Sequence, residues 1–157
     1  MTEEQKTIKE LLLAFYQENA SQCRHHETLR ANVTSTIIAI DSIVIGLITL
    51  GQKISPIDRP LTIFLILLGL FGMIISLKHY ERYKFHSGRC RQYRTKLDKL
   101  FTNGLILELQ EEAKTEHEKS FFYLYKMRNY QWWAAIHLIV VVIGIILTLF
   151  SIKGYPH

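Results

Sequence analysis

The sequence predicts an all-α membrane protein in which three transmembrane helices continue into a cytoplasmic helical bundle. Aliphatic residues concentrate in three windows, residues 33–50, 61–77 and 134–152, each about as long as a helix must be to cross a ~30 Å hydrocarbon core. Asp41 is the only charged residue inside these windows. Because a globule of 157 residues cannot bury three such uniformly apolar helices, we expect all three to span a membrane.

The segment before the first window is predicted to form a helix that runs into it without a break. Residues 2–5, TEEQ, match a capping box, with Thr2 as the N-cap and Gln5 three residues later. Seam positions then recur in steps of three and four, and neither Gly nor Pro occurs before Gly46. Residues 1–32 should therefore be a cytoplasmic helix that is continuous with the first span.

The second span is predicted to continue in the same way. Two prolines in the loop at residues 51–60 mark a turn, and Asp58 is expected to cap the start of the span. No helix breaker follows residues 61–77, so the helix should reach about Phe101. The tripeptide Thr-Asn-Gly at residues 102–104 then signals a turn.

Residues 78–132 are expected to form a cytoplasmic helical hairpin. Its second arm is a third helix that starts at Leu105 and continues into the last span. Trp132 and Trp133 lie where an aromatic belt at the membrane interface belongs. Since no repeat, low-complexity tract or linker separates these elements, we expect residues 1–157 to form a single domain.

The distribution of Lys and Arg predicts the orientation of the spans. Residues 1–32 carry four, residues 51–60 carry two, residues 78–132 carry twelve, and the tail after the last span carries one. Because cytoplasmic loops are enriched in these residues, the N-terminus and the hairpin should lie in the cytoplasm and the C-terminus outside. The first 30 residues are polar and do not resemble a signal peptide, so we expect the mature chain to begin at Met1.

Asp41 stands out because it lies near the middle of the first span. A carboxylate at that depth is costly unless it is protonated or paired, so it should face other helices or water. One interpretation is a protonated Asp that hydrogen-bonds across a helix interface, and the other is part of a pore lining or gate. For the second interpretation, the candidate pore or gate residues are Asp41, Ser42 and Thr49.

A basic stretch, KHYERYKFHSGRCRQYRTKLDK at residues 78–99, follows the second span and carries eight Lys or Arg against two carboxylates. Its periodicity is that of an amphipathic helix. The charges nearest the span favour orientation and attraction to anionic headgroups. Two interpretations remain for the basic residues farther from the span, at positions 89–99. They could form ion pairs with the glutamates at 108–118, or they could recognise a nucleotide, a nucleic acid or a protein. The candidate trigger or partner surface consists of Arg82, His86, Arg89, Arg91 and Arg94.

Three seam residues of the first helix, Asn19, Gln22 and His26, are predicted to form a buried hydrogen-bond layer that fixes the helix register. Cys23 and the histidines near it lack the i, i+4 spacing of metal ligands on a helix, so no metal is expected. The sequence contains no phosphate-binding glycine loop and no grouping that suggests a nucleophile, so we expect neither enzymatic activity nor a cofactor. Cys23 and Cys90 should be reduced thiols in the cytoplasm.

The predicted elements occur in the order of a cytoplasmic helix, a transmembrane hairpin and the basic helix YERYKFHSGRCRQYRTKLDKLF. Over roughly residues 15–101, this arrangement resembles the SLATT-type effector domains of bacterial conflict systems. The resemblance implies a small protein of the bacterial inner membrane that forms a pore in antiphage defence and arrests the infected cell (abortive infection). The resemblance also implies that the first two spans form the pore-forming hairpin. The basic helix would then be the sensing or coupling element. The third span departs from the two-crossing plan of that family.

The resulting expectation is a membrane effector that permeabilises or depolarises the lipid bilayer when a cytoplasmic sensor protein or a nucleotide triggers it. It should form a homo-oligomer, because one three-helix subunit has too little perimeter to enclose a conducting path. The alternative is a non-conducting adaptor whose basic helices recruit or inhibit a partner protein, or bind a nucleotide or nucleic acid. A third interpretation is a membrane enzyme that acts on RNA or nucleotides, although no catalytic motif supports it.

Overall fold

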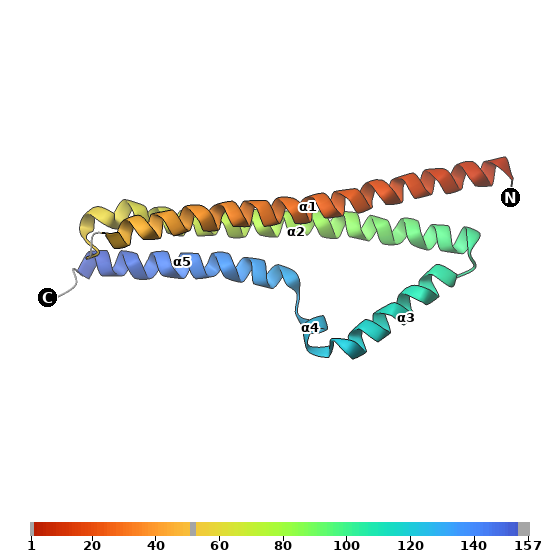
Figure 1. Cartoon of the computed structure of the whole chain (residues 1–157). Coiled ribbons are helices and arrows are strands. Elements are labelled where there is room, and N and C mark those ends of the chain that lie inside the picture. The colour runs from red at the N-terminus through yellow and green to blue at the C-terminus, as the bar shows by residue number, and fades with distance from the viewer. Residues whose placement is uncertain (1, 51–52, 154–157) are drawn as a thin grey trace. The chain divides into compact units, whose positions relative to one another are not determined.

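A computed structural model describes residues 2–50 and 53–153 of the chain and shows no strand among them. The elements in chain order are α1 (Glu3–Leu50), the 3₁₀ turn η1 (Pro56–Asp58), α2 (Arg59–Phe101), α3 (Leu105–Ser120), α4 (Phe122–Lys126) and α5 (Asn129–Lys153) (Figure 1). The helices α1, α2 and α5 are long and apolar enough to cross a membrane. The all-helical class and the three apolar helices are therefore confirmed.

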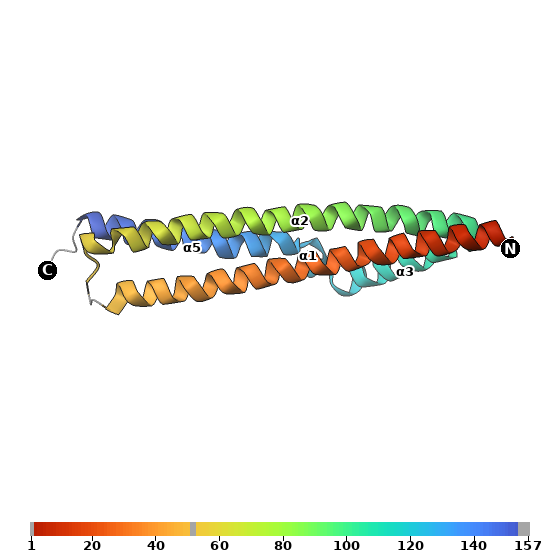
Figure 2. The same cartoon turned by 90° about the horizontal axis from the view of Figure 1, so that it is seen from above.

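The helices divide into two compact units. The span unit consists of residues 28–79 and 129–157, and it contains the apolar halves of α1 and α2 together with α5. The head unit consists of residues 1–27 and 80–128, and it contains the polar halves of α1 and α2 together with α3 and α4. Within the span unit, α5 lies beside both α1 and α2 (Figure 2).

The start of α1 and the end of α2 follow local signals in the sequence. The Gln5 N–H donates to the Thr2 hydroxyl oxygen at 3.2 Å, and the Thr2 N–H donates to the Gln5 side-chain oxygen at 2.9 Å, which is the predicted capping box. α2 ends at Phe101, and the next turn contains Asn103 and Gly104 with positive φ angles of 52° and 97°. Both predicted helix ends are confirmed.

The turn between α1 and α2 differs from the prediction. Asp58 does not cap α2, because its carboxylate accepts hydrogen bonds from the backbone N–H and the hydroxyl of Ser55 at 2.8 and 3.0 Å. Ser55 and Asp58 have the spacing of a capping box, with Pro56 between them. The Asp58 side chain therefore closes the 3₁₀ turn that precedes α2. Residues 51 and 52 of the predicted outer loop and residues 154–157 of the C-terminal tail lie outside the described residues.

The prediction of one continuous third helix is wrong, because the helix is interrupted twice before the last span. α3 ends at Ser120, Phe121 has a non-helical φ of −129° and ψ of 42°, and α4 ends where Met127 becomes extended with φ −79° and ψ 122°. No Gly or Pro is present at these breaks. The run FFYLY at residues 121–125 is mainly aromatic, and aromatic side chains lose rotamer freedom in a helix. Between α3 and α5 the chain therefore forms only the five-residue helix α4, with a break on each side of it.

A buried carboxylate joins the end of α2 to the start of α3. The Asp98 side chain is fully buried and accepts hydrogen bonds from the backbone N–H of Ile106 at 2.8 Å, from that of Leu107 at 3.4 Å and from the Thr102 hydroxyl. These N–H groups belong to the first turn of α3, where a helix has no partners of its own for them. Burial acts to raise the pKa of Asp98, but these hydrogen bonds outweigh it and hold the pKa below its ordinary value.

We predict that Asp98 makes the start of α3 sensitive to acid. Because its pKa is lowered in the folded state, the carboxylate stabilises the fold fully above its unfolded-state pKa of about 4, and this contribution is lost as the pH falls through the folded value. Asp98→Asn should remove that pH dependence and speed amide hydrogen exchange at Ile106 and Leu107 about tenfold. Exchange would be measured by mass spectrometry across the acidic range.

The matched control for this cap is Glu108→Gln, which removes an exposed carboxylate from the same first turn of α3. It should leave exchange at the two amides within about twofold of the wild-type rate, because exposed charges in a first turn contribute little. Equal exchange rates in wild type and in Asp98→Asn would contradict the capping role.

Candidate functional site

The span unit buries polar side chains along the inner faces of all three helices. We call the following residues the polar seam: Arg30, Thr34 and Asp41 on α1, Thr62 and Ser76 on α2, and His137 and Ser151 on α5. Polar groups within membrane helices are costly, and they are retained where they face other helices or carry out a function. The seam is therefore the first place in this unit to look for function.

His137 joins the three helices at one level of the seam. Its ring is fully buried, and a hydrogen bond of 3.2 Å connects its Nε2 to the Thr34 hydroxyl on α1. The ring also lies against Gly72 on α2, where a Cβ atom would collide with it. At the neighbouring level, the Arg30 guanidinium carbon lies 5.5 Å from the centroid of the Trp133 ring. Side chains on α5 thus hold α1 and α2 at this end of the unit.

Asp41 lies two helical turns beyond Thr34 on the same face of α1. It is only 3% exposed, and neither carboxyl oxygen has a hydrogen-bond partner among the described residues. Farther along the same face, Val44 and Ile48 pack against Leu65 of α2, so the carboxyl group is followed by an apolar cluster. A buried carboxyl group without a partner is expensive, and in membrane helices such groups mark ion or proton pathways. Asp41 is the strongest functional candidate in the unit.

The two other predicted pore residues do not join Asp41 in the interior. Ser42 and Thr49 are exposed, and their hydroxyls donate to backbone oxygens of their own helix, at Ile38 over 2.8 Å and at Ile45 over 3.0 Å. One copy of the chain therefore holds Asp41 inside and presents Ser42 and Thr49 on its outer surface. The three residues do not line a common lumen in one copy.

At the other end of the span unit, the seam contains contacts that the sequence analysis missed. The Thr148 hydroxyl donates to the Thr62 hydroxyl at 2.9 Å, and the Arg59 guanidinium donates to the backbone oxygen of Ser151 at 3.3 Å. A signal for this face was present, since His137 and Ser151 are two heptads apart on α5 and so share one side of the helix.

Close approach of α2 and α5 depends on two glycines. A Cβ atom built on Gly69 would lie 2.8 Å from a Val141 methyl carbon and 3.1 Å from the Val141 backbone nitrogen. A Cβ atom built on Gly144 would lie 2.8 Å from an Ile66 side-chain carbon and 3.1 Å from the Ile66 backbone nitrogen. Backbone atoms cannot move aside as a side chain can, so both positions require glycine, as membrane helix interfaces often do.

In the head unit, the predicted polar layer is partly assembled and gains a histidine from α2. Asn19 is buried, and its Oδ1 accepts a hydrogen bond from the Nδ1 of His86 at 3.0 Å. The rings of His26 and His86 stack with their centroids 5.6 Å apart. Gln22 instead donates to Glu18 on its own helix at 2.9 Å. His86, which the sequence assigns to the trigger surface, is therefore half-buried against α1.

The arginines of the predicted trigger surface differ in their exposure. Arg82, Arg89 and Arg91 are exposed on α2, whereas Arg94 is half-buried. Arg82 lies 3.7 Å from Glu81 in an exposed ion pair, and such pairs contribute little to stability. Of the four arginines in the predicted surface, only these three are therefore accessible.

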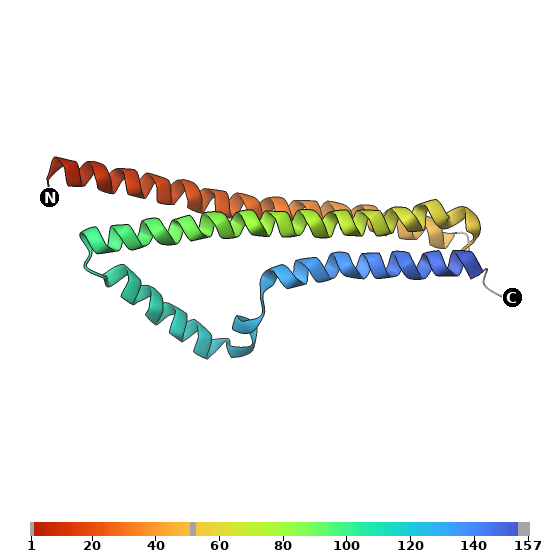
Figure 3. The ribbon, with the colours of Figure 1, turned by 180° about the vertical axis from the view of Figure 1, so that it is seen from behind.

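The expected ion pairs between the basic stretch and α3 are not formed. Among the described residues, no Lys or Arg at positions 89–99 pairs with a glutamate of α3, and Glu111 pairs instead with Lys114 on its own helix at 2.9 Å. The reason is geometric: α3 turns away from α2 after Gly104 (Figure 3), and no residue of α3 is buried. A basic face on α2 and an acidic face on α3 both remain open.

Two thiols lie between α1 and α2 in the head unit. The Cys23 S–H donates to the Tyr83 backbone oxygen and the Cys90 S–H to the Tyr16 backbone oxygen, each at 3.7 Å. Both cysteines are free and half-buried. Burial, followed by the effect of the neighbouring Cys90, raises the pKa of Cys23 to about 11. Cys23 is therefore a protonated thiol at neutral pH.

No protein-family model, curated protein or solved structure matches the chain. The function is therefore inferred from the polar seam, the open faces of the head unit and the three apolar helices. Among these features, Asp41 is the strongest indication of function. Its carboxyl group has no hydrogen-bond partner among the described residues and is followed by an apolar cluster, so packing alone does not explain it.

Proposed function

We propose that this protein is a small effector of the bacterial inner membrane that assembles into homo-oligomers and, when triggered, permeabilises or depolarises the membrane. The observation that carries the proposal is Asp41, which is 3% exposed and has no hydrogen-bond partner among the described residues, in a helix long enough to cross a membrane. His137 differs in that its Nε2 is hydrogen-bonded to Thr34, whereas both oxygens of Asp41 lack a partner among the described residues. An unpaired carboxyl group fits a site that acts when the assembly opens.

Assembly is part of the proposal because the interior of one span unit is tightly packed. Val44, Ile48 and Leu65 form a buried apolar cluster beyond Asp41, so conduction requires helices to separate or neighbouring copies to contribute. The outward hydroxyls of Ser42 and Thr49 lie on α1, on the surface that another copy would face. A ring of copies related by rotation is the usual way to close such an assembly.

A role in antiphage defence by abortive infection rests on the resemblance to SLATT-type domains over residues 15–101. The proposed orientation, with the N-terminus inside and the C-terminus outside, rests on the excess of Lys and Arg in the 78–132 hairpin. The helix α5 is additional to the two-crossing plan of that family, and it is hydrogen-bonded to both hairpin helices through Thr34 and Thr62. We assign it the role of holding the hairpin closed before the trigger arrives.

The experiment that tests the proposal follows the membrane potential of bacterial cells during induced expression, with the abundance of the protein in the membrane measured in parallel. A depolarisation that rises more steeply than linearly with abundance would support conduction by an assembly. Because the proposed effector acts only when triggered, the same measurement is made on Gly144→Val, in which α5 is displaced from α2. An unchanged potential for both proteins, at abundances where chemical crosslinking already detects oligomers, would contradict the proposal. An unrelated three-span protein expressed to the same level controls for crowding of the membrane.

A second candidate function, a non-conducting adaptor, is favoured by the open charged faces of the head unit. Exposed basic side chains on α2 and exposed glutamates on α3 do not pair with one another among the described residues. Complementary charge of this kind steers partners and selects among them. In this case Asp41 would serve only to space the helices, and the cytoplasmic partner would be a protein or a nucleotide.

We predict that reversing charge on the basic face separates the two candidate functions. Arg89→Glu combined with Arg91→Glu should reduce crosslinking of cytoplasmic proteins to the chain about tenfold, because exposed complementary charges control encounter. Insertion into the membrane should be unchanged, since both side chains are exposed. Crosslinked proteins would be quantified by mass spectrometry, and insertion by membrane fractionation.

The matched control for the basic face is Lys6→Glu combined with Lys9→Glu, which makes the same change in charge at exposed positions of α1. Equal losses of crosslinking in the two double variants would show that only net charge matters. Failure of the arginine variant to insert would show that these arginines are structural.

A further inference from the structure

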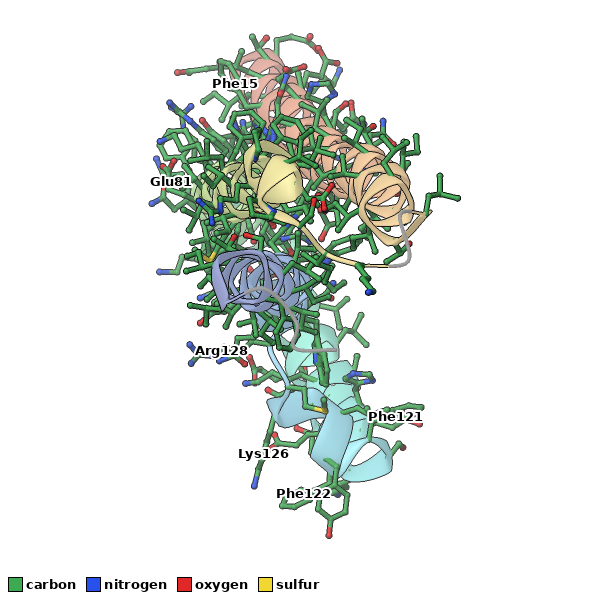
Figure 4. All side chains as sticks on the ribbon, turned by 90° about the vertical axis from the view of Figure 1, so that its left-hand side faces the viewer. Phe15, Glu81, Phe121, Phe122, Lys126 and Arg128 are labelled. Carbon is green, nitrogen blue, oxygen red and sulfur yellow. The ribbon has the colours of Figure 1, made fainter. Side chains whose placement is uncertain are left out.

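The segment between α3 and α5, which contains the short helix α4, exposes a set of large apolar side chains. Phe121, Phe122, Tyr123, Leu124 and Met127 are 50%, 49%, 83%, 65% and 43% exposed. Figure 4 shows Phe121 and Phe122 projecting outward at the junction of α3 and α4. We call residues 121–128 the aromatic elbow. Exposed apolar patches of this kind mark contact sites with proteins, ligands or lipids.

Cations accompany the aromatic rings in the elbow. The Lys126 ammonium lies 3.9 Å from the centroid of the Phe122 ring, and Arg128 follows two residues later. No acidic residue occurs in the sequence after Glu118. Aromatic rings beside Lys and Arg are typical of segments in the lipid headgroup region, where the rings contact upper acyl chains and the cations reach phosphates.

The chain also fixes how far the elbow can be from the third apolar window. Arg128 directly precedes α5, and the window begins at Ala134, so the intervening helix is about 9 Å long at 1.5 Å per residue. The headgroup region on each side of a bilayer is about 5 to 8 Å thick. Along the membrane normal, Arg128 therefore reaches the outer edge of the headgroup region, and a tilt of α5 brings it within that region.

We propose that the aromatic elbow is a lipid-binding element that lies in the headgroup region of the cytoplasmic leaflet and binds anionic phosphates. The inference rests on the membrane placement and orientation in the proposed function. It accounts for two findings at once, namely that α3 and α5 are separate helices although no Gly or Pro divides them, and that the rings between them are exposed. The break lets the rings of α4 turn toward lipid without requiring α3 to enter the membrane.

Lipid is a better occupant of this surface than a second copy of the chain. A symmetric dimer would bring the same patch from both copies together. Lys126 of the two copies would then be brought together, and residues 121–128 contain no carboxylate to offset the repulsion. An anionic leaflet offers the opposite charge at the same depth as the rings.

The test uses the full-length protein in vesicles of phosphatidylcholine and phosphatidylglycerol, with a single tryptophan as a depth probe. Tyr123→Trp is made in a background with Trp132→Phe and Trp133→Phe. The matched control is Leu109→Trp in the same background, at a position of α3 that is 56% exposed. Quenching is measured with lipids brominated near the top of the acyl chain and, separately, with iodide in the aqueous phase.

For the elbow probe, we expect brominated lipid to quench at least about half of the fluorescence and iodide to quench about threefold less than at the control position. Adding Lys126→Gln to the Tyr123→Trp protein should reduce the extra quenching that phosphatidylglycerol brings, because one phosphate contact is removed. The proposal would be overturned if iodide quenched the fluorescence of the elbow tryptophan as strongly as at the control position while brominated lipid did not quench it. A probe shielded from both quenchers would also overturn it, since protein would then cover the elbow.

Wild-type protein separates failure of the elbow from failure of the membrane placement. Trp132 and Trp133 lie at the start of α5, so brominated lipid should quench both. If these native tryptophans are quenched while the elbow probe is open to iodide, only the elbow is wrong. If the native tryptophans are not quenched, the membrane placement itself is wrong, and the elbow inference falls with it.

Discussion

Asp41→Asn is expected to slow depolarisation by this protein at least about tenfold, while its abundance in the membrane stays the same. Asparagine has nearly the shape of aspartate but carries neither a charge nor a titratable proton. The exchange breaks no hydrogen bond among the described residues, because neither oxygen of Asp41 makes one. The stability of the span unit should therefore hold or rise, since an Asp at the centre of a membrane helix costs about 2.5 to 3.5 kcal/mol on insertion.

The measurement is the rate at which a potential-sensitive dye responds in cells at matched membrane abundance. Thr36→Ala is the matched control, because Thr36 is exposed on the same helix and its hydroxyl donates to its own backbone, at Asn32 over 2.9 Å. It should behave as wild type. Wild-type depolarisation by Asp41→Asn would exclude Asp41 as a gate. The adaptor hypothesis predicts the same potential in all three proteins.

Gly69→Val and Gly144→Val are each expected to destabilise the span unit by about 1 to 3 kcal/mol, the usual cost of overpacking. At both positions, a Cβ atom would lie within 3.1 Å of a backbone nitrogen on the facing helix, so relief requires α2 and α5 to move apart. The free energy of unfolding would be measured by titrating the protein from mild detergent micelles into a denaturing detergent.

Gly46→Val provides the matched control for these glycines. Gly46 also lies in an apolar helix, but a Cβ atom there would meet no atom within 4 Å, so its effect should stay within about 0.5 kcal/mol. Equal stability of Gly69→Val and Gly46→Val would contradict close packing of α2 and α5. If α5 holds the hairpin closed, Gly144→Val should also depolarise cells without a trigger.

The fold features that could be predicted from the sequence are those that local chemistry decides. The capping box at Thr2 and Gln5 and the turn that contains Gly104 are confirmed, because each depends on a few adjacent residues. The apolar helices could be predicted because length and composition alone set that signal. The break at Phe121 could not, because aromatic residues are only weakly unfavourable in a helix and their exposure depends on what surrounds them.

The candidate site was less predictable because its contacts join helices that are distant in sequence. His86 was assigned to a surface, but its partner Asn19 is 67 positions away, so spacing on α2 alone could not show which way it faces. Asp98 was overlooked for a similar reason, since it caps a helix that begins beyond the next turn. The burial of Asp41 was expected from depth in the span, whereas its lack of partners depends on the packing of all three helices.

The raised pKa of Cys23 has a practical consequence for chemical labelling. With a pKa of about 11, only about one Cys23 in 10,000 is a thiolate at pH 7, and thiolate is the form that maleimides attack. Replacing Cys90 with serine removes the second cysteine and its effect on Cys23, but burial between α1 and α2, the largest cause, still raises the pKa of Cys23 and keeps its labelling slow. A single reporter cysteine, for example at Ile57, which is 85% exposed, would give a readable signal from one side of a bilayer.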